Sequence, residues 1–273
     1  MTKAKSRATP FLRVTILGCG GSGGVPQIGG DDGRGWWGAC DPANPLNQRT
    51  RSSILLEGGG GGRLLVDTGP DLRTQLLACR VAGVDAVLFT HDHADHVMGL
   101  DEVRILNRII GRPLEAFGTE RTLSILKQRF DYAFLPSTGP VFYRPAVEPV
   151  RLQAGDAVTI AGHAVQTFLQ DHAVMETLGF RVGRFAYSTD LVRLPAESLA
   201  QLHGLDTWVV GCFQRRPHKV HANLDQVLEW VDLLRPRRTI LTHMSPDLDH
   251  DWMQANLPAG VEAAHDGMVL TLD

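Results

Sequence analysis

The sequence predicts an α/β protein of the αββα type, in which two mixed sheets pack face to face with helices outside. Short apolar runs of strand type alternate with helical patterns through both halves of the chain. This alternation favours sheets that are covered by helices. The 273 residues fit one such domain. Because no repeat or linker interrupts the pattern, we expect a single domain over residues 11–273, preceded by a disordered lead at 1–10.

The first half of the chain alternates apolar runs with two conspicuous loops. Glycine-rich residues 58–62 are expected to join two strands as an enlarged hairpin turn. Residues 131–150 contain four prolines and no clear hydrophobic period, so we expect a loop there that covers the functional site described below. Asp71 and Thr119 are expected to be N-caps. The expected strands are 12–17, 52–57, 63–67 and 86–90, and the expected helices are 72–82, 101–110 and 120–130.

The second half of the chain continues this alternation. Asn223 is expected to cap a helix, with Gln226 in the capping-box position. The expected strands are 150–152, 157–160, 164–169, 178–182, 185–188, 206–211, 239–242 and 268–272, and the expected helices are 196–202, 224–234 and 249–256.

Composition excludes several classes of protein. The net charge of −3 gives no reason to expect long nucleic acid as a partner, although a locally basic pocket remains compatible with a small phosphorylated substrate. No stretch reaches the ~18 apolar residues of a membrane span. The cysteines are scattered without a C-x-x-C pair, which favours a reduced cytoplasm. They are Cys19, Cys40, Cys79 and Cys212.

A dense set of metal-binding side chains follows the apolar strand at 86–90. His91, His93, Asp95 and His96 fall within six residues. They cannot all reach one tetrahedral ion from so short a turn, so we expect two ions, one facing the first two histidines and one facing Asp95 and His96. Each set then needs a ligand from distant sequence, and a catalytic site keeps a position for water. The alternative interpretation is a solvated turn rich in histidine and aspartate.

This motif resembles the signature of the metallo-β-lactamase superfamily, and the resemblance extends over nearly the whole chain. It implies three further ligands in order: His172, the bridging carboxylate of Asp190, and His243. It also implies the sandwich fold of that superfamily and a hydrolase with two divalent ions. Nitrogen and oxygen donors favour Zn or Mn. Ions about 3.5–4 Å apart can hold a bridging hydroxide that acts as the nucleophile.

Two features near the first strands bear on the site. Asp67 is expected to hydrogen-bond a ligand imidazole and fix its tautomer, although it also fits a simple turn before Gly69. The loop 18–26 is similar to that of the phosphodiesterase branch, which includes ribonuclease Z and the cyclic phosphodiesterase of phosphonate degradation. Backbone amides at Ser22 and Gly23 are candidates to bind phosphate oxygens. A glycine loop without a ligand is the alternative.

A basic loop precedes the helix expected at 224–234. Arg215 and Arg216 there are candidates for phosphate binding near a helix N-terminus. The phosphonate-pathway enzymes carry a histidine at this place, followed by a spacer and Leu-Asp, and His221 matches that pattern. The resemblance implies that His221 is the transition-state stabiliser or general acid, with His218 assisting it and Asp190 bridging the ions. A solvated basic loop is the alternative interpretation.

The early loop also departs from the phosphonate-pathway enzymes. Those proteins hold a structural zinc through clustered cysteines and a histidine, whereas residues 36–47 contain only Cys40 and position 246 is Pro246. We therefore expect no third metal ion. Trp36 and Trp37 are candidates to stack on a nucleobase or ribose. The alternative is that they anchor the loop on the core.

Together these features favour a binuclear phosphodiesterase that acts on a small cyclic or nucleotide-like phosphodiester. One alternative is a hydrolase of a carboxylic ester, thioester or lactone on the same site. A second is a non-catalytic, nucleotide-binding member of the fold. We expect no long nucleic acid and no membrane as partner, and the sequence leaves open whether the protein is a homodimer.

Overall fold

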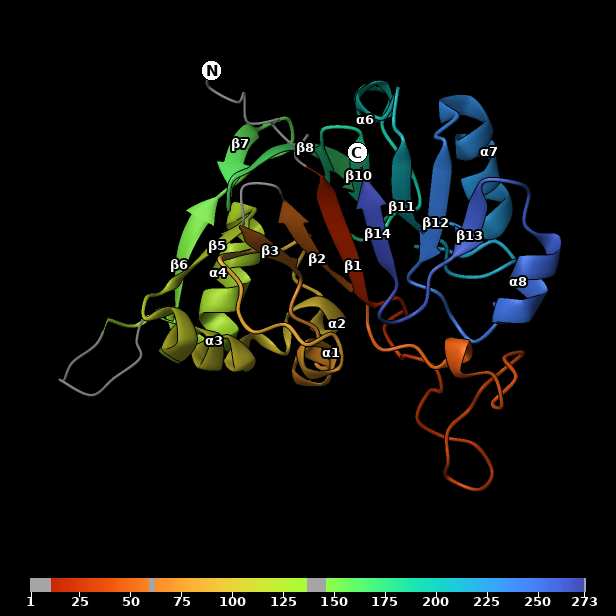
Figure 1. Cartoon of the computed structure of the whole chain (residues 1–273), viewed down its shortest axis with the longest axis horizontal. Coiled ribbons are helices and arrows are strands. Elements are labelled where there is room, and N and C mark those ends of the chain that lie inside the picture. The colour runs from red at the N-terminus through yellow and green to blue at the C-terminus, as the bar shows by residue number, and fades with distance from the viewer. Residues whose placement is uncertain (1–10, 59–61, 137–145, 273) are drawn as a thin grey trace, which may run out of the picture.

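The computed structural model describes residues 11–58, 62–136 and 146–272. It contains two seven-stranded sheets that face each other, with helices on the outside (Figure 1). The expected αββα class is therefore confirmed. The expected lead at 1–10, residues 59–61 of the glycine turn and residues 137–145 of the proline-rich loop lie outside the described residues. Among the described helices, none is long and apolar enough to cross a membrane.

The first sheet is antiparallel at one side and parallel at the other. Strands β14, β1, β2 and β3 pair antiparallel, and β3 to β6 pair parallel. In spatial order the strands are β14 (Val269–Leu272), β1 (Leu12–Gly18), β2 (Ser53–Gly58), β3 (Arg63–Val66), β4 (Ala86–Leu88), β5 (Leu114–Gly118) and β6 (Val147–Arg151). The helices in this half are α1 (Leu72–Ala78), α2 (Ala94–Val97), α3 (Val103–Ile110), α4 (Glu120–Arg129) and α5 (Asp131–Phe134), with 3-10 turns at Pro45–Asn47 and Leu100–Glu102.

The second sheet has the same mixed character. Strands β10 to β13 pair parallel, and β7 to β10 pair antiparallel. In spatial order they are β13 (Val261–Ala263), β12 (Arg238–Thr242), β11 (Thr207–Gly211), β10 (Phe185–Ser188), β9 (Glu176–Val182), β8 (His163–Asp171) and β7 (Ala157–Ile160). Its helices are α6 (Ala196–Gln201), α7 (Leu224–Leu234) and α8 (His250–Asn256), and Figure 1 shows α7 and α8 beside β12 and β13.

The alternation of side chains along β2 explains why two layers of core form. Ile54 and Leu56 belong to the cluster between the sheets, together with Phe180 of β9. Leu55 points to the other face, where it joins the cluster that includes Leu123 of α4. A strand places successive side chains on opposite faces, so one continuous apolar run can bury both faces of the first sheet.

The sequence-based expectations about the ends of the first-half helices are confirmed at Thr119 and corrected at α1. Thr119 does cap α4, because its side chain accepts a hydrogen bond from Thr122 N. Asp71 makes no such bond: its carboxylate accepts from Arg51 N at 2.8 Å, and α1 ends at Ala78 instead of 82. The Asp71 carboxylate thus forms a tertiary hydrogen bond in place of the helix cap that the local sequence predicts.

The capping box expected at α7 is also absent among the described contacts. Asn223 occupies the N-cap position, but its side chain makes no bond to the helix and donates to Arg215 O. Gln226 donates instead to Val192 O at 2.6 Å. The proline-rich stretch is structured at both ends, by α5 and β6. Strands β5 and β13 were not expected from the sequence.

Strand ends deliver the candidate ligands to one region. His91 follows β4, Asp190 follows β10 and His243 directly follows β12. In α/β sheets the carboxyl ends of parallel strands form the usual crevice for ligands. The sandwich therefore brings these strand ends of both sheets together at one site.

Candidate metal centre

The seven expected ligands form two groups that share one residue. His91, His93 and His172 form the first group with Asp190, and Asp95, His96 and His243 form the second with the same Asp190. Within each group the ligand atoms lie within 4.8 Å of one another. The structure thus brings together side chains that are up to 152 positions apart, from His91 to His243. Each group is able to hold a metal ion.

The two oxygens of the Asp190 carboxylate face different groups. Oδ1 lies 4.0 Å from His91 Nε2 and 3.7 Å from His172 Nε2. Oδ2 lies 3.1 Å from His96 Nε2 and 3.3 Å from His243 Nε2. A carboxylate in this position can contribute one oxygen to each of two ions.

The donor atoms fit divalent cations. His91 Nε2 is buried and lacks a hydrogen-bond partner, although buried polar atoms are nearly always paired. Burial lowers the pKa of His91, which keeps the imidazole in the neutral form that binds metal. Burial opposes ionisation of Asp190, but the neighbouring His243 and His96 hold its pKa well below the usual value. The neighbouring carboxylates of Asp95, Asp190 and Asp67 act in the opposite sense on His96, whose pKa they raise despite its burial.

Asp67 lies behind His96 in the site. Its Oδ2 is 2.7 Å from His96 Nδ1, and the carboxylate also accepts from Thr90 N and Thr90 Oγ1, both at 2.8 Å. The Nδ1 nitrogen of His96 is thereby engaged, which leaves Nε2 directed at the shared carboxylate. A backbone carbonyl does the same for His172, whose Nδ1 lies 2.6 Å from Val220 O. Such contacts fix the tautomer and orientation of metal-binding imidazoles.

Three residues of the centre have left-handed backbone conformations. The φ angles are 62° at Asp67, 52° at Asp190 and 55° at His243. Residues with side chains seldom adopt this conformation, which costs of order 1–3 kcal/mol and clusters at functional sites. All three lie directly after a strand or within two residues of its end. The sharp change of direction at the strand end coincides with the side chains that line the centre.

His221 lies beside the centre but outside both groups of ligands. Its Nδ1 is 3.7 Å from Asp190 Oδ1, and its ring centroid lies 4.7 Å from that of His172 and 4.9 Å from that of His243. Burial lowers its pKa to about 3, so the imidazole is neutral near pH 7. His218 stacks on it, with ring centroids 5.2 Å apart and planes 27° apart. The structure therefore places both expected histidines at the edge of the centre.

An aromatic residue that the sequence reasoning missed also belongs to this region. The Phe213 ring lies 4.6 Å from the His221 ring, centroid to centroid, and 4.8 Å from the His218 ring. Phe213 follows β11 by two residues, at the same edge as the strand ends that carry the ligands. That position was the available signal, since the residue type alone does not suggest a role.

The two arginines of the basic loop are placed differently. Arg215 forms a two-pronged ion pair with Asp247, and its guanidinium lies 5.0 Å from the Trp252 ring centroid. Its charge is thus already engaged within the protein. Arg216 is exposed.

The glycine loop runs next to the last ligand. Gly21 N donates to Met244 O at 3.0 Å, one residue after His243, whereas Ser22 and Gly23 are exposed. The chain then forms a loop in which Gln27 pairs with Trp36, and this part projects away from both sheets (Figure 1). The Trp36 side chain is 51% exposed, and Trp37 is half-buried.

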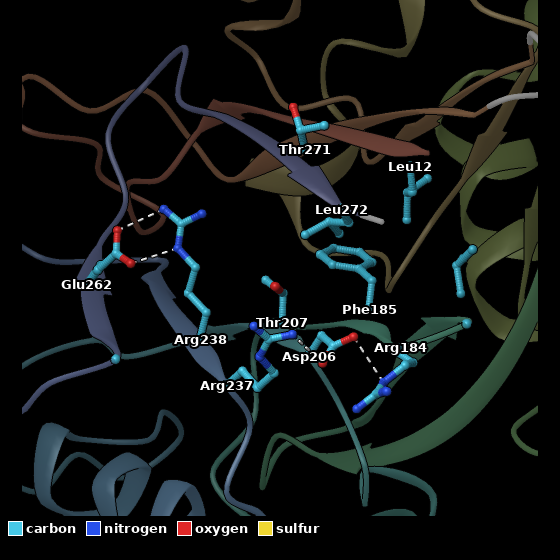
Figure 2. A pocket seen from close by; sticks show the side chains of 13 residues that line it. Leu12, Arg184, Phe185, Asp206, Thr207, Arg237, Arg238, Glu262, Thr271 and Leu272 are labelled. Carbon is cyan, nitrogen blue, oxygen red and sulfur yellow. Dashed lines mark hydrogen bonds and ion pairs between the residues drawn. The ribbon is translucent and has the colours of Figure 1, made fainter. Parts of the chain in front are cut away.

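A separate cavity of about 570 Å³ lies at the opposite end of the second sheet, where β11 and β12 begin (Figure 2). Leu12, Phe185 and Leu272 form its apolar part. Its charged groups are paired: Asp206 with Arg184 and Arg237, and Arg238 with Glu262. This cavity is distinct from the centre that the ligands form.

Known proteins share this fold and are similar to this chain in sequence. A family model described as a beta-lactamase superfamily domain matches residues 62–244. The crystal structure of a diphosphatase from the PhnP family is 34% identical, with a TM-score of 0.86, and the match covers 97% of this chain and 98% of that one.

Two curated relatives are more distant. An octanoyltransferase from Porphyromonas gingivalis is 27% identical over 96% of this chain, which spans about half (52%) of that protein's length. Coenzyme PQQ synthesis protein B from Methylococcus capsulatus is 24% identical, over 95% of this chain and 99% of that protein. The names of the diphosphatase, the octanoyltransferase and the PQQ synthesis protein describe different chemistry, so the shared fold alone does not identify the substrate.

Proposed function

This chain belongs to the beta-lactamase superfamily, and from that premise we propose that it is a binuclear phosphodiesterase acting on a small cyclic or nucleotide-like phosphodiester. The observation that carries the proposal is the position of His221, 3.7 Å from the carboxylate that the two ligand groups share. A neutral imidazole there can serve the leaving oxygen of a substrate held at the centre. The 34% identity to a PhnP-family diphosphatase supports phosphorus chemistry.

In this proposal His91, His93 and His172 would hold one divalent ion, Asp95, His96 and His243 would hold the other, and Asp190 would contribute to both. Nitrogen and oxygen donors favour Zn or Mn. When bound, such ions supply Lewis acidity and lower the pKa of water towards neutrality. No serine or cysteine nucleophile is then required.

The chain's own residues supply orientation and a hydrogen-bond donor. The imidazole of His221 donates an N–H hydrogen bond to the leaving oxygen, where negative charge develops. His218 packs against it and restricts its movement. Exposed Arg216 and Lys219 in the same loop add positive charge for an anionic substrate, although the whole chain carries −3.

A substrate panel tests this proposal. Metal-loaded protein is compared on bis(p-nitrophenyl) phosphate, p-nitrophenyl acetate and a simple lactone, with His221→Ala as the matched variant. We expect kcat/KM to be highest for the phosphodiester and to fall in the variant. A preference for the acetate or the lactone would overturn the phosphodiester assignment.

One observation favours a second candidate, hydrolysis of a carboxylic ester or thioester. The relative that spans about twice the length of this chain is an octanoyltransferase, and that name describes acyl transfer. An octanoyl thioester added to the same panel distinguishes the two candidates. Absence of turnover on every substrate with every metal would instead favour the non-catalytic, nucleotide-binding alternative.

A further inference from the structure

The orientation of His221 depends on the rings around it. Neither ring nitrogen of His221 forms a hydrogen bond with any of the described residues. The nearest charged atom to the ring is Asp190 Oδ1, 3.7 Å from His221 Nδ1. The Phe213 ring stacks on the imidazole with centroids 4.6 Å apart and planes only 22° apart. Stacked aromatic pairs are favourable beyond the apolar area that they bury. Among the aromatic rings around His221, that of Phe213 lies nearest and most nearly parallel to the imidazole, so its flat face constrains the tilt of the His221 ring.

Phe213 also joins the segments on both sides of the site through its backbone. Its N–H donates to Ala222 O at 2.9 Å, directly after His221. Its carbonyl oxygen accepts from Ser245 N at 2.9 Å, two residues after His243. The Phe213 ring lies 6.1 Å from the His243 ring, centroid to centroid. One residue thus holds the His221 loop in register with the segment that carries a metal ligand.

The glycine loop passes over the edge of the same ring. A Cβ atom at Gly21 would lie 2.8 Å from Phe213 Cε2, closer than real Cβ contacts allow. Gly21 has no left-handed φ, so the requirement for glycine is one of space. Gly21 N is fixed by its hydrogen bond to Met244 O, so the loop cannot move away freely. The ring of Phe213 is thereby confined between Gly21 and His221.

We propose that Phe213 is a positioning residue for His221, and that Gly21 is glycine so that the glycine loop can hold the Phe213 ring against that imidazole. The role of His221 as donor to the leaving oxygen rests on the proposed function. The geometric part of the proposal, that Phe213 fixes the His221 ring, does not.

The test compares Phe213→Leu, which removes the flat face but keeps an apolar side chain, with Phe213→Tyr, which keeps the ring. Both are assayed on bis(p-nitrophenyl) phosphate and diphenyl phosphate, because phenolate is a poorer leaving group than p-nitrophenolate. We expect Phe213→Leu to lower kcat for diphenyl phosphate by up to about 10²-fold, the scale of a misplacement of about 1 Å. The loss for bis(p-nitrophenyl) phosphate should be smaller. KM and metal content should remain near wild type, and Phe213→Tyr should restore kcat.

Phe185→Leu is the matched control, because Phe185 is a buried ring at the far cavity (Figure 2). It should lower the melting temperature without a loss that depends on the leaving group. If Phe213→Leu behaves as this control does, or loses metal, a merely structural role is shown and the proposal is overturned. Gly21→Ala should reproduce the Phe213→Leu defect and add little to it in the double variant. Full additivity would contradict the confinement of the ring.

A readout without turnover separates this inference from the proposed function. In crystals of metal-loaded Phe213→Leu we expect the His221 ring to rotate or to lose order while the ligands around Asp190 keep their positions. An unchanged His221 ring would overturn the inference even if phosphodiesters are hydrolysed. A displaced ring would support it even if the natural substrate is an acyl compound.

Discussion

The Nδ1 nitrogen of His96 lies 2.7 Å from the Oδ2 oxygen of Asp67, and both side chains are fully buried. This contact assigns the proton of His96 to Nδ1 and leaves Nε2 to face Asp190. Because a buried carboxylate can accept several hydrogen bonds at once, Asp67 also holds the Thr90 backbone. The strand end and the ligand imidazole are thus oriented by one side chain.

We expect Asp67→Asn to lower metal affinity by about 10- to 100-fold, because an amide cannot accept all the hydrogen bonds that the carboxylate accepts. Competition with a chelator of known affinity measures the change. Asp71→Asn is the control, since Asp71 loses the same charge four residues away but contacts Arg51. Equal metal affinity in the Asp67 variant and wild type would show that the contact does not tune the ligand.

Asp190 should be required for the binding of both ions, whereas a ligand that belongs to one group should be required for one ion. We expect elemental analysis to find fewer metal ions per chain in each variant. The occupancy of both sites should fall in Asp190→Ala, whereas that of one site should fall in His172→Ala or in His243→Ala, because these two residues belong to different groups. His203→Ala, at an exposed position, is the control. Loss of a single ion in Asp190→Ala would argue against a shared carboxylate.

His221→Ala should separate catalysis from metal binding. Since His221 lies outside both ligand groups, we expect metal content near that of wild type, with kcat lower by about 10²–10⁴-fold if the imidazole serves the leaving oxygen. Steady-state kinetics beside elemental analysis measure both quantities. Loss of metal would mean that His221 is itself a ligand.

Trp36 is the better placed of the two tryptophans to meet a nucleobase, because it is exposed and Trp37 is half-buried. We expect Trp36→Ala to weaken binding of a mononucleotide by about 1–3 kcal/mol, the usual contribution of base stacking, with the fold unchanged. Titration calorimetry measures the affinity. Ile28→Ala removes an exposed apolar side chain from the same loop without removing a ring. Unchanged affinity in Trp36→Ala would remove stacking from the mechanism.

Much of the architecture follows from short-range patterns, and what was missed has physical reasons. The ligands between His91 and His96 are readable because their spacing is local. Asp190 and His243 were reached only through a family resemblance, since nothing near them in sequence requires metal. Strand β13 has three residues, too few for a period, and β5 carries a glutamate.

The missed contacts are those that depend on tertiary structure. The local sequence predicts Asp71 as a helix cap, but in the fold its carboxylate accepts a hydrogen bond from Arg51 N. Phe213 is an ordinary aromatic residue until the fold places it against His221 and Gly21. No local pattern distinguishes such residues, because their partners lie on separate elements.

Anomalous diffraction from crystals grown with Zn or Mn tests the central claim most directly. A centre built around the shared carboxylate predicts two peaks per chain, one among His91, His93 and His172, the other among Asp95, His96 and His243, with Asp190 between them. A single peak, or peaks away from Asp190, would contradict it.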